Sequence, residues 1–196
     1  MPVPPEVVYV HPNATAPHPL LLLLHGAGGK GERIFARMQD DLKTVPGLVV
    51  VAPDSRGRTW DIADSEAGPD VQFIDGVLRN VFGHYAIDGH RIAVAGFSDG
   101  ASYALALGLT NGDLFTHVMA FSPGFLAVQH ASPAKPRVFI AHGRDDDIIP
   151  FAHGGQHIAA QLRDSNYDVT FRAFDDGHTV RREIVAEAMK WWSLPR

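Results

Sequence analysis

Seven short apolar segments, separated by longer helical or irregular stretches, constrain the fold of this chain more than any other feature. Most of them are almost entirely apolar, which is typical of strands whose two faces are both covered. Strands that alternate with helices form a largely parallel sheet between helical layers. The sequence therefore predicts an α/β fold, a three-layer α/β/α sandwich with a mostly parallel sheet. The predicted strands are residues 6–10, 20–24, 48–52, 91–95, 116–121, 137–141 and 168–174.

Two segments have the spacing of amphipathic helices. Apolar residues recur every three or four positions in residues 69–85 and again in residues 179–192. No repeat or linker divides the 196 residues, so we expect one domain over residues 1–196. The chain has no cysteine, which excludes a cysteine nucleophile, a thiolate metal site and a disulfide scaffold.

Charge and hydropathy restrict the partners. The chain carries 17 Lys and Arg against 22 Asp and Glu, a net charge of −5, and no long basic run, so we expect no nucleic-acid partner. Its longest apolar run, residues 20–24, is far shorter than the roughly 20 residues that span a bilayer. A secretory signal would require basic residues near its start, but no basic residue precedes Lys30. We expect a cytoplasmic monomer or small homo-oligomer without a membrane span.

The segment Gly96-Phe97-Ser98-Asp99-Gly100 matches the pattern Gly-x-Ser-x-Gly. An apolar strand runs into it and a helix rich in small residues runs out. In that setting a strained turn projects the serine hydroxyl above the sheet, at the positive end of the helix. Glycines allow the sharp turn and the close crossing of strand and helix. Ser98 is therefore the candidate nucleophile; the alternative is a helix N-cap.

A serine nucleophile needs a base, and the base needs an acid to orient it. In this setting the acid and then the histidine follow the serine along the chain. His178 lies in a polar turn between the last predicted strand and the last helix, and it is the candidate base. His153 and His157 are interpreted as the solvated start of a helix, because glycines follow His153 where a zinc motif would need glutamate.

The acid comes from a run of three carboxylates directly after the strand at residues 137–141. Asp145, Asp146 and Asp147 cannot all point into one pocket, because like charges repel one another. We expect one of them to face His178 and the others to be solvated or paired with Arg144. Spacing alone does not choose among the three.

Small residues after the strand at residues 20–24 favour an oxyanion hole. Gly26, Ala27, Gly28 and Gly29 allow backbone N–H groups to approach a substrate carbonyl, and the N–H of Asp99 would be the second donor. His25 is interpreted as a structural support of this loop. Residues 53–68 and 122–136 follow strands and are the expected pocket walls. The candidate substrate-contacting residues are Trp60, Phe125, Leu126, Ile148 and Ile149, each of which could equally belong to the core.

Together these motifs resemble the α/β-hydrolase superfamily, and within it the small phospholipase/carboxylesterase-like serine esterases. The resemblance covers nearly the whole chain and includes the run His142-Gly143-Arg144-Asp145-Asp146-Asp147. It implies an α/β-hydrolase fold, assigns the acid to Asp146 and the oxyanion donors to the backbone of Ala27 and Asp99, and implies a small-molecule ester substrate with no metal or cofactor.

The implied activity is a serine carboxylesterase that works through an acyl-enzyme. Residues 122–136 are too few for a helical lid, so we expect a minimal form without a cap, an open site and a preference for small or short-acyl esters. An acyl-thioesterase, a feruloyl-esterase-like enzyme or a polyester-depolymerase-like enzyme would use the same triad. The further alternative is a non-catalytic ligand-binding module, because a fold does not fix a function.

Overall fold

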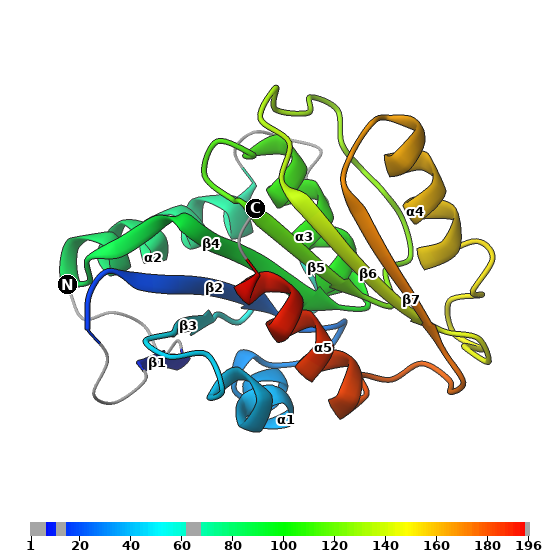
Figure 1. Ribbon diagram of the computed structural model, residues 1–196, viewed down its shortest axis with the longest axis horizontal. Helices are drawn as coiled ribbons and strands as arrows, with labels where there is room; N and C mark the ends of the chain where they lie inside the picture. Colours follow the sequence, from blue (N-terminus) through cyan, green and yellow to red (C-terminus); the bar gives the residue numbers. More distant parts are fainter. Residues whose placement is uncertain (1–6, 11–14, 62–67, 195–196) are drawn as a thin grey trace.

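The apolar segments form one seven-stranded sheet in the computed structural model, which describes residues 7–10, 15–61 and 68–194 (Figure 1). The order across the sheet is β1-β3-β2-β4-β5-β6-β7, and every neighbouring pair is parallel except β1 with β3. The strands are β1 (Val7–Val10), β2 (His18–Leu24), β3 (Val49–Ala52), β4 (Ile87–Phe97), β5 (His117–Phe121), β6 (Arg137–Gly143) and β7 (Val169–Phe174). The helices are α1 (Gly31–Leu42), α2 (Pro69–His84), α3 (Asp99–Thr110), α4 (Gly155–Asp164) and α5 (Arg182–Ser193).

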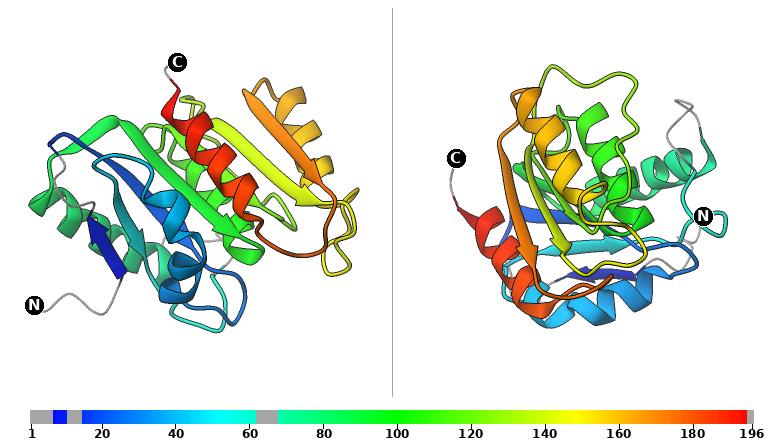
Figure 2. Two further views of the ribbon diagram at one scale, coloured as in Figure 1. Left: turned by 60° about the horizontal axis from the view of Figure 1, so that its bottom comes forward. Right: turned by 90° about the vertical axis from the view of Figure 1, so that its right-hand side faces the viewer.

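Helices cover both faces of the sheet, which explains why the buried parts of its central strands are mostly apolar. Successive strand residues point to opposite faces. In β2, Leu20, Leu22 and Leu24 therefore pack with α2, α3 and α4. Leu21 and Leu23 pack with α1 and α5 on the other face (Figure 2). The predicted three-layer α/β/α sandwich is confirmed.

The ends of some elements differ from the prediction. Strand β4 begins four residues early, at Ile87, because its polar and exposed first part pairs with β2 across a register shift after His18. Helix α5 begins at Arg182 instead of residue 179. Glu6, at the start of the first predicted strand, and residues 62–67 of the loop at 53–68 lie outside the described residues.

Six parallel strands bring their carboxyl ends to one edge of the sheet, where ligands of open α/β sheets bind. The segments that follow β2, β3, β4, β5, β6 and β7 meet there (Figure 1). Residues 122–136, after β5, contain no helix, as expected for a form without a cap. None of the helices in the described residues is long and apolar enough to cross a membrane.

Candidate active site

Ser98 lies in a strained turn between β4 and α3. Its φ of 57° and ψ of −122° are costly for a residue with a side chain, by about 1–3 kcal/mol. The turn is held because the Ser98 amide donates to the carbonyl of Phe121 at 2.9 Å, and the Ser98 carbonyl accepts the amides of Ala101 and Ser102. Strand, turn and helix thus hold the Ser98 hydroxyl at the carboxyl edge of the sheet.

Gly96 and Gly100 allow the close crossing that this turn needs. A Cβ atom on Gly96 would stand 2.1 Å from the carbonyl oxygen of Gly100. A Cβ atom on Gly100 would stand 2.4 Å from the carbonyl oxygens of Leu24 and His25, at the end of β2. Side chains at these positions would therefore push α3 away from β2 and β4.

Gly100→Ala is expected to lower the free energy of unfolding by about 1–3 kcal/mol, because the added methyl group meets backbone atoms that cannot rotate away. Chemical denaturation with urea measures the change. Gly76→Ala in α2 is the matched control, since a Cβ atom there has no neighbour within 4 Å. The control should gain about 0.5–1 kcal/mol. Equal effects at the two positions would contradict the steric explanation.

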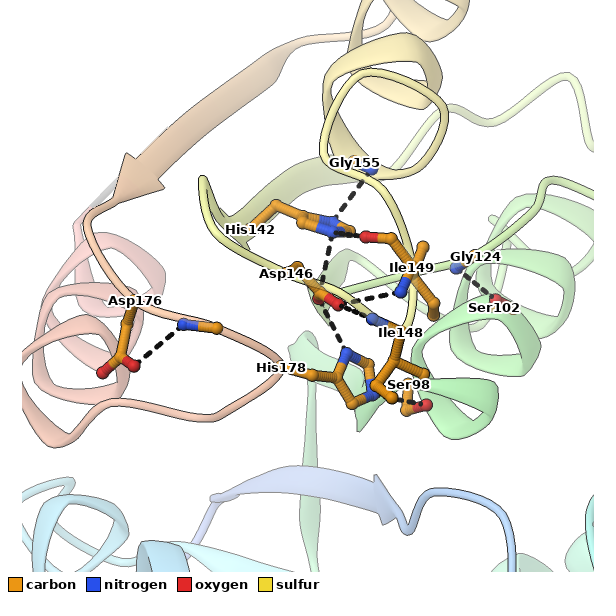
Figure 3. Close-up of polar contacts among 11 residues, drawn as sticks. Ser98, Ser102, Gly124, His142, Asp146, Ile148, Ile149, Gly155, Asp176 and His178 are labelled. Atoms are coloured by element: carbon orange, nitrogen blue, oxygen red, sulfur yellow. Dashed lines mark hydrogen bonds and ion pairs between the residues drawn. The ribbon is translucent and has the colours of Figure 1, made fainter.

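Ser98, His178 and Asp146 form a chain of hydrogen bonds although 80 and 32 residues separate the partners (Figure 3). His178 Nε2 lies 3.0 Å from Ser98 Oγ, and His178 Nδ1 lies 2.7 Å from Asp146 Oδ2. The imidazole also packs against the ring of Phe97, with 4.8 Å between the centroids. A hydroxyl, an imidazole and a carboxylate in this order can perform nucleophilic catalysis.

Backbone hydrogen bonds bring the turn that carries His178 to the loop that carries Asp146. The Arg144 amide donates to the carbonyl of Phe174 at 2.8 Å, and the Asp145 amide donates to that of Asp176 at 3.1 Å. These bonds continue the pairing of β6 with β7 beyond the strand ends. The acid and the base are therefore placed by the sheet itself.

Of the three adjacent carboxylates, only Asp146 turns inward. Asp145 and Asp147 are exposed, and Arg144 pairs with Asp175 instead of with either of them. Burial by itself would raise the pKa of Asp146. The amides of Ile149 and Ile148, together with His178, outweigh burial and lower this pKa below its usual value. The carboxylate is thus held in its charged form beside His178.

The loop after β2 presents backbone amides near Ser98. The amides of Gly28 and Gly29 donate to the carbonyls of Arg58 and Gly26, which fixes the loop. Within the described part of the chain, the amides of Ala27 and Asp99 have no such backbone acceptor. The amide of Asp99 belongs to the first turn of α3, whose N–H groups have no partner inside the helix.

His25 supports the loop after β2 through the hydrogen bonds of its side chain. Its imidazole is buried, donates through Nδ1 to the Gly26 carbonyl at 2.7 Å and accepts the Ser55 amide on Nε2 at 3.0 Å. Burial lowers the pKa of His25, which favours the neutral ring that this pattern requires. The Trp60 indole donates to the His25 carbonyl at 2.7 Å.

A buried carboxylate that sequence reasoning missed fixes the loop after β3. Asp70, at the start of α2, is 1% exposed and accepts the amides of Arg56 and Asp61. Asp61 in turn accepts the hydroxyl of Tyr103 at 2.6 Å. The only sequence signal was an aspartate directly after Pro69, at the expected helix start, where carboxylates are common.

A pocket of about 90 Å³ lies beside the serine turn. It is lined by Thr59, Trp60, Asp99, Ser102, Tyr103, Ala106, Phe125 and Ala127. The hydroxyl of Thr59 donates to Asp99 at 2.8 Å, and Ser102 Oγ accepts the amide of Gly124, which ties residues 122–136 to α3. Two of the five candidate contact residues, Trp60 and Phe125, therefore line this pocket.

The other three candidate contact residues lie elsewhere. Leu126 packs against the core on the α2, α3 and α4 face of the sheet. Ile149 lies next to the positions of Gly124 and Gly154. Ile148 is 67% exposed beside Asp146. Apolar residue type alone did not distinguish a pocket wall from a core residue or an exposed one.

A mostly parallel sheet with helices on both faces and a strained serine turn after β4 defines the α/β-hydrolase fold. The sequence profile of the phospholipase/carboxylesterase family matches residues 70–194. The chain belongs to this family.

Individual proteins are similar to this chain in sequence or in fold. The probable feruloyl esterase C of Aspergillus flavus is 25% identical over 197 residues, which cover 85% of this chain and 72% of that protein. The crystal structure of esterase PE8 superposes with a TM-score of 0.78 at 24% identity, over 95% of each chain. The carboxylesterase of Bacillus cereus superposes with a TM-score of 0.74 at 20% identity, over 95% of this chain and 93% of that chain.

Proposed function

We propose that this protein is a serine carboxylesterase that hydrolyses small or short-acyl esters through a covalent acyl-enzyme. The observation that supports it most is the hydrogen bond between Ser98 Oγ and His178 Nε2, with Asp146 on the opposite ring nitrogen. This arrangement gives the hydroxyl a base and gives the base a fixed tautomer. Membership of the phospholipase/carboxylesterase family supports the same reaction class.

In the first half-reaction, Ser98 Oγ bonds to the ester carbonyl carbon while His178 Nε2 takes the hydroxyl proton. The carbonyl π electrons move to the oxygen, and the backbone N–H groups of Ala27 and Asp99 stabilise the resulting oxyanion. As the carbonyl reforms, the bond to the alcohol oxygen breaks, and His178 gives its proton to the departing alcohol. The carboxylate of Asp146 stabilises the positive charge of His178 while the histidine holds the extra proton.

In the second half-reaction, water repeats these steps on the acyl-enzyme. His178 takes a proton from the water as its oxygen bonds to the acyl carbon. The collapse of the second tetrahedral intermediate breaks the bond to Ser98 Oγ, and His178 returns the proton to that oxygen. The products are one alcohol and one carboxylic acid.

The pocket beside the turn limits the acyl group. Because His178 protonates the leaving alcohol, the alcohol lies on the His178 side of Ser98. The pocket lining includes Asp99 and Ser102 but not His178, so we assign the pocket to the acyl group. Its volume of about 90 Å³ is smaller than the roughly 150 Å³ of a cavity that takes benzene. Acyl groups of a few carbons therefore fit it.

A series of p-nitrophenyl esters from acetate to palmitate tests the proposed function. We expect the highest kcat/KM between acetate and butyrate and a fall of about tenfold or more by octanoate. The reason is that one methylene too many for an apolar pocket costs about 1–3 kcal/mol. Release of p-nitrophenol is followed by absorbance. A maximum at palmitate would contradict the short-acyl assignment, and absence of hydrolysis across the series would contradict the esterase.

Feruloyl-ester hydrolysis is the second candidate function. It is favoured by the sequence likeness to a protein named probable feruloyl esterase C. The feruloyl ring is larger than the pocket and would have to lie outside it, beside the exposed ring of Phe125. Methyl ferulate, assayed beside p-nitrophenyl butyrate, separates the two. A higher kcat/KM on methyl ferulate would make the feruloyl ester the preferred substrate.

A further inference from the structure

His142 lies beside the proposed triad but has no part in the mechanism above. It is near the end of β6, and its side chain is fully buried. Its Nε2 is 3.2 Å from Oδ2 of Asp146, the same oxygen that His178 contacts through Nδ1 at 2.7 Å. Two imidazoles therefore converge on one carboxylate oxygen (Figure 3).

The contacts of His142 indicate which ring nitrogen carries its proton. The amide of Gly155 donates to Nδ1 at 3.0 Å, so Nδ1 is an acceptor. Burial lowers the pKa of His142 and outweighs the opposing influence of the Ile149 carbonyl and of Asp146, which favours the neutral ring. A neutral imidazole has one N–H. That N–H is on Nε2, which faces the Ile149 carbonyl at 2.9 Å and Asp146 Oδ2.

Asp146 consequently has donors on both carboxylate oxygens. The amides of Ile148 and Ile149 donate to Oδ1 at 3.0 and 2.8 Å. Oδ2 accepts His178 Nδ1 and lies 3.2 Å from His142 Nε2, whose single N–H also faces the Ile149 carbonyl. The terminal torsion of an aspartate is soft, so contacts to Oδ1 alone do not define the position of Oδ2. The nearby N–H of His142 gives Oδ2 a second polar contact, from a residue that takes no part in the proton transfers.

We propose that His142 is a positioning residue, which holds Oδ2 of Asp146 in line with Nδ1 of His178. This inference rests on the proposed function and concerns the orientation of the acid. The competing explanation is a structural role, in which His142 only joins the start of α4 to the loop through Gly155. The two ring nitrogens separate the contact with Gly155, on Nδ1, from the contacts with Asp146 and the Ile149 carbonyl, on Nε2.

Two substitutions distinguish the roles. In His142→Asn, the side-chain oxygen reaches the position of Nδ1 and can still accept the amide of Gly155, but the shorter side chain does not reach Asp146. The longer His142→Gln places an N–H near the position of Nε2 and loses the acceptor for Gly155. We expect His142→Asn to lower kcat by about 10- to 100-fold with KM within about twofold, as for a misplaced catalytic group. His142→Gln should recover most of this kcat despite a lower Tm.

The control is His117→Asn, which replaces another buried histidine, at the opposite end of the sheet. It should lower Tm and leave kcat within about twofold of the wild type. A wild-type kcat in His142→Asn would overturn the proposal. Equal losses of kcat in both His142 variants would do so too, since they indicate a structural role. An inactive wild-type protein would instead refute the proposed function.

A measurement on the resting wild-type protein needs no activity and no variant. Two-bond ¹H–¹⁵N correlation spectra report which nitrogen of each imidazole is protonated. We expect the neutral tautomer of His142 with its proton on Nε2. A neutral ring with its proton on Nδ1 would overturn the proposal even if both variants fail to fold.

Discussion

Ser98→Ala is expected to lower kcat by at least about 10⁴-fold, because the variant lacks the hydroxyl that forms the acyl-enzyme. The fold should be retained, since the alanine keeps the Cβ atom and loses only the hydroxyl. The free energy of unfolding should change by less than about 0.5 kcal/mol. Hydrolysis of p-nitrophenyl butyrate and labelling by a fluorophosphonate probe measure the loss.

Ser98→Gly is the matched variant for this experiment. It also lacks the hydroxyl, but glycine adopts a φ of 57° at no steric cost. It should therefore be as inactive as Ser98→Ala, and its free energy of unfolding should be about 1 kcal/mol higher than that of Ser98→Ala. Activity that persists in both variants would exclude Ser98 as the nucleophile.

Asp146→Asn is expected to lower kcat by about 10⁴-fold, the loss seen when a triad aspartate is made neutral. Oδ1 of Asp146 accepts the amides of Ile148 and Ile149, so the introduced amide keeps its oxygen there. Its NH₂ then faces Nδ1 of His178. A donor at that place favours the tautomer with the proton on Nε2, which cannot accept the proton of Ser98.

Asp145→Asn and Asp147→Asn are the controls, because they remove the same charge from the same turn on exposed side chains. Their kcat values should stay within about twofold of the wild type. A loss of about 10⁴-fold in either control, with activity retained in Asp146→Asn, would place the acid on a different residue. Circular dichroism checks that each variant is folded.

Much of the fold was predictable because it follows from local pattern. Strands buried on both faces are mostly apolar, and the buried parts of β2 to β6 show this plainly. The first part of β4 was missed because Asp88, Gly89 and His90 are polar or lack a side chain and lie outside the core. Helix α1 was not located, and α4 was predicted only by its start near His153 and His157. The N-cap residues, Lys30 and Gly154, make no side-chain capping hydrogen bond of the kind that Ser, Thr, Asp or Asn provides at a helix start.

The candidate pocket residues show what the local sequence pattern cannot predict. Trp60 was a candidate contact residue, and it lines the pocket while 4% exposed, because its indole donates to the His25 carbonyl and its ring stacks on Tyr103. Ile148 has the same apolar character and is mostly exposed. Hydrophobicity measures the cost of exposure to water, and it carries no information about which surface covers a side chain.

By itself, the sequence determined the parallel sheet, the serine turn after β4 and the histidine after β7, because each is written in residues that are neighbours along the chain. The spacing of the residues left open which of three adjacent aspartates reaches His178, and the family resemblance assigned it to Asp146. Only the tertiary structure shows this contact and that His142 approaches the same carboxylate. Asp145, Asp146 and Asp147 are chemically identical. The direction in which the β6–α4 loop turns them depends on its bonds to the β7–α5 turn, which lies some 30 residues further along the chain.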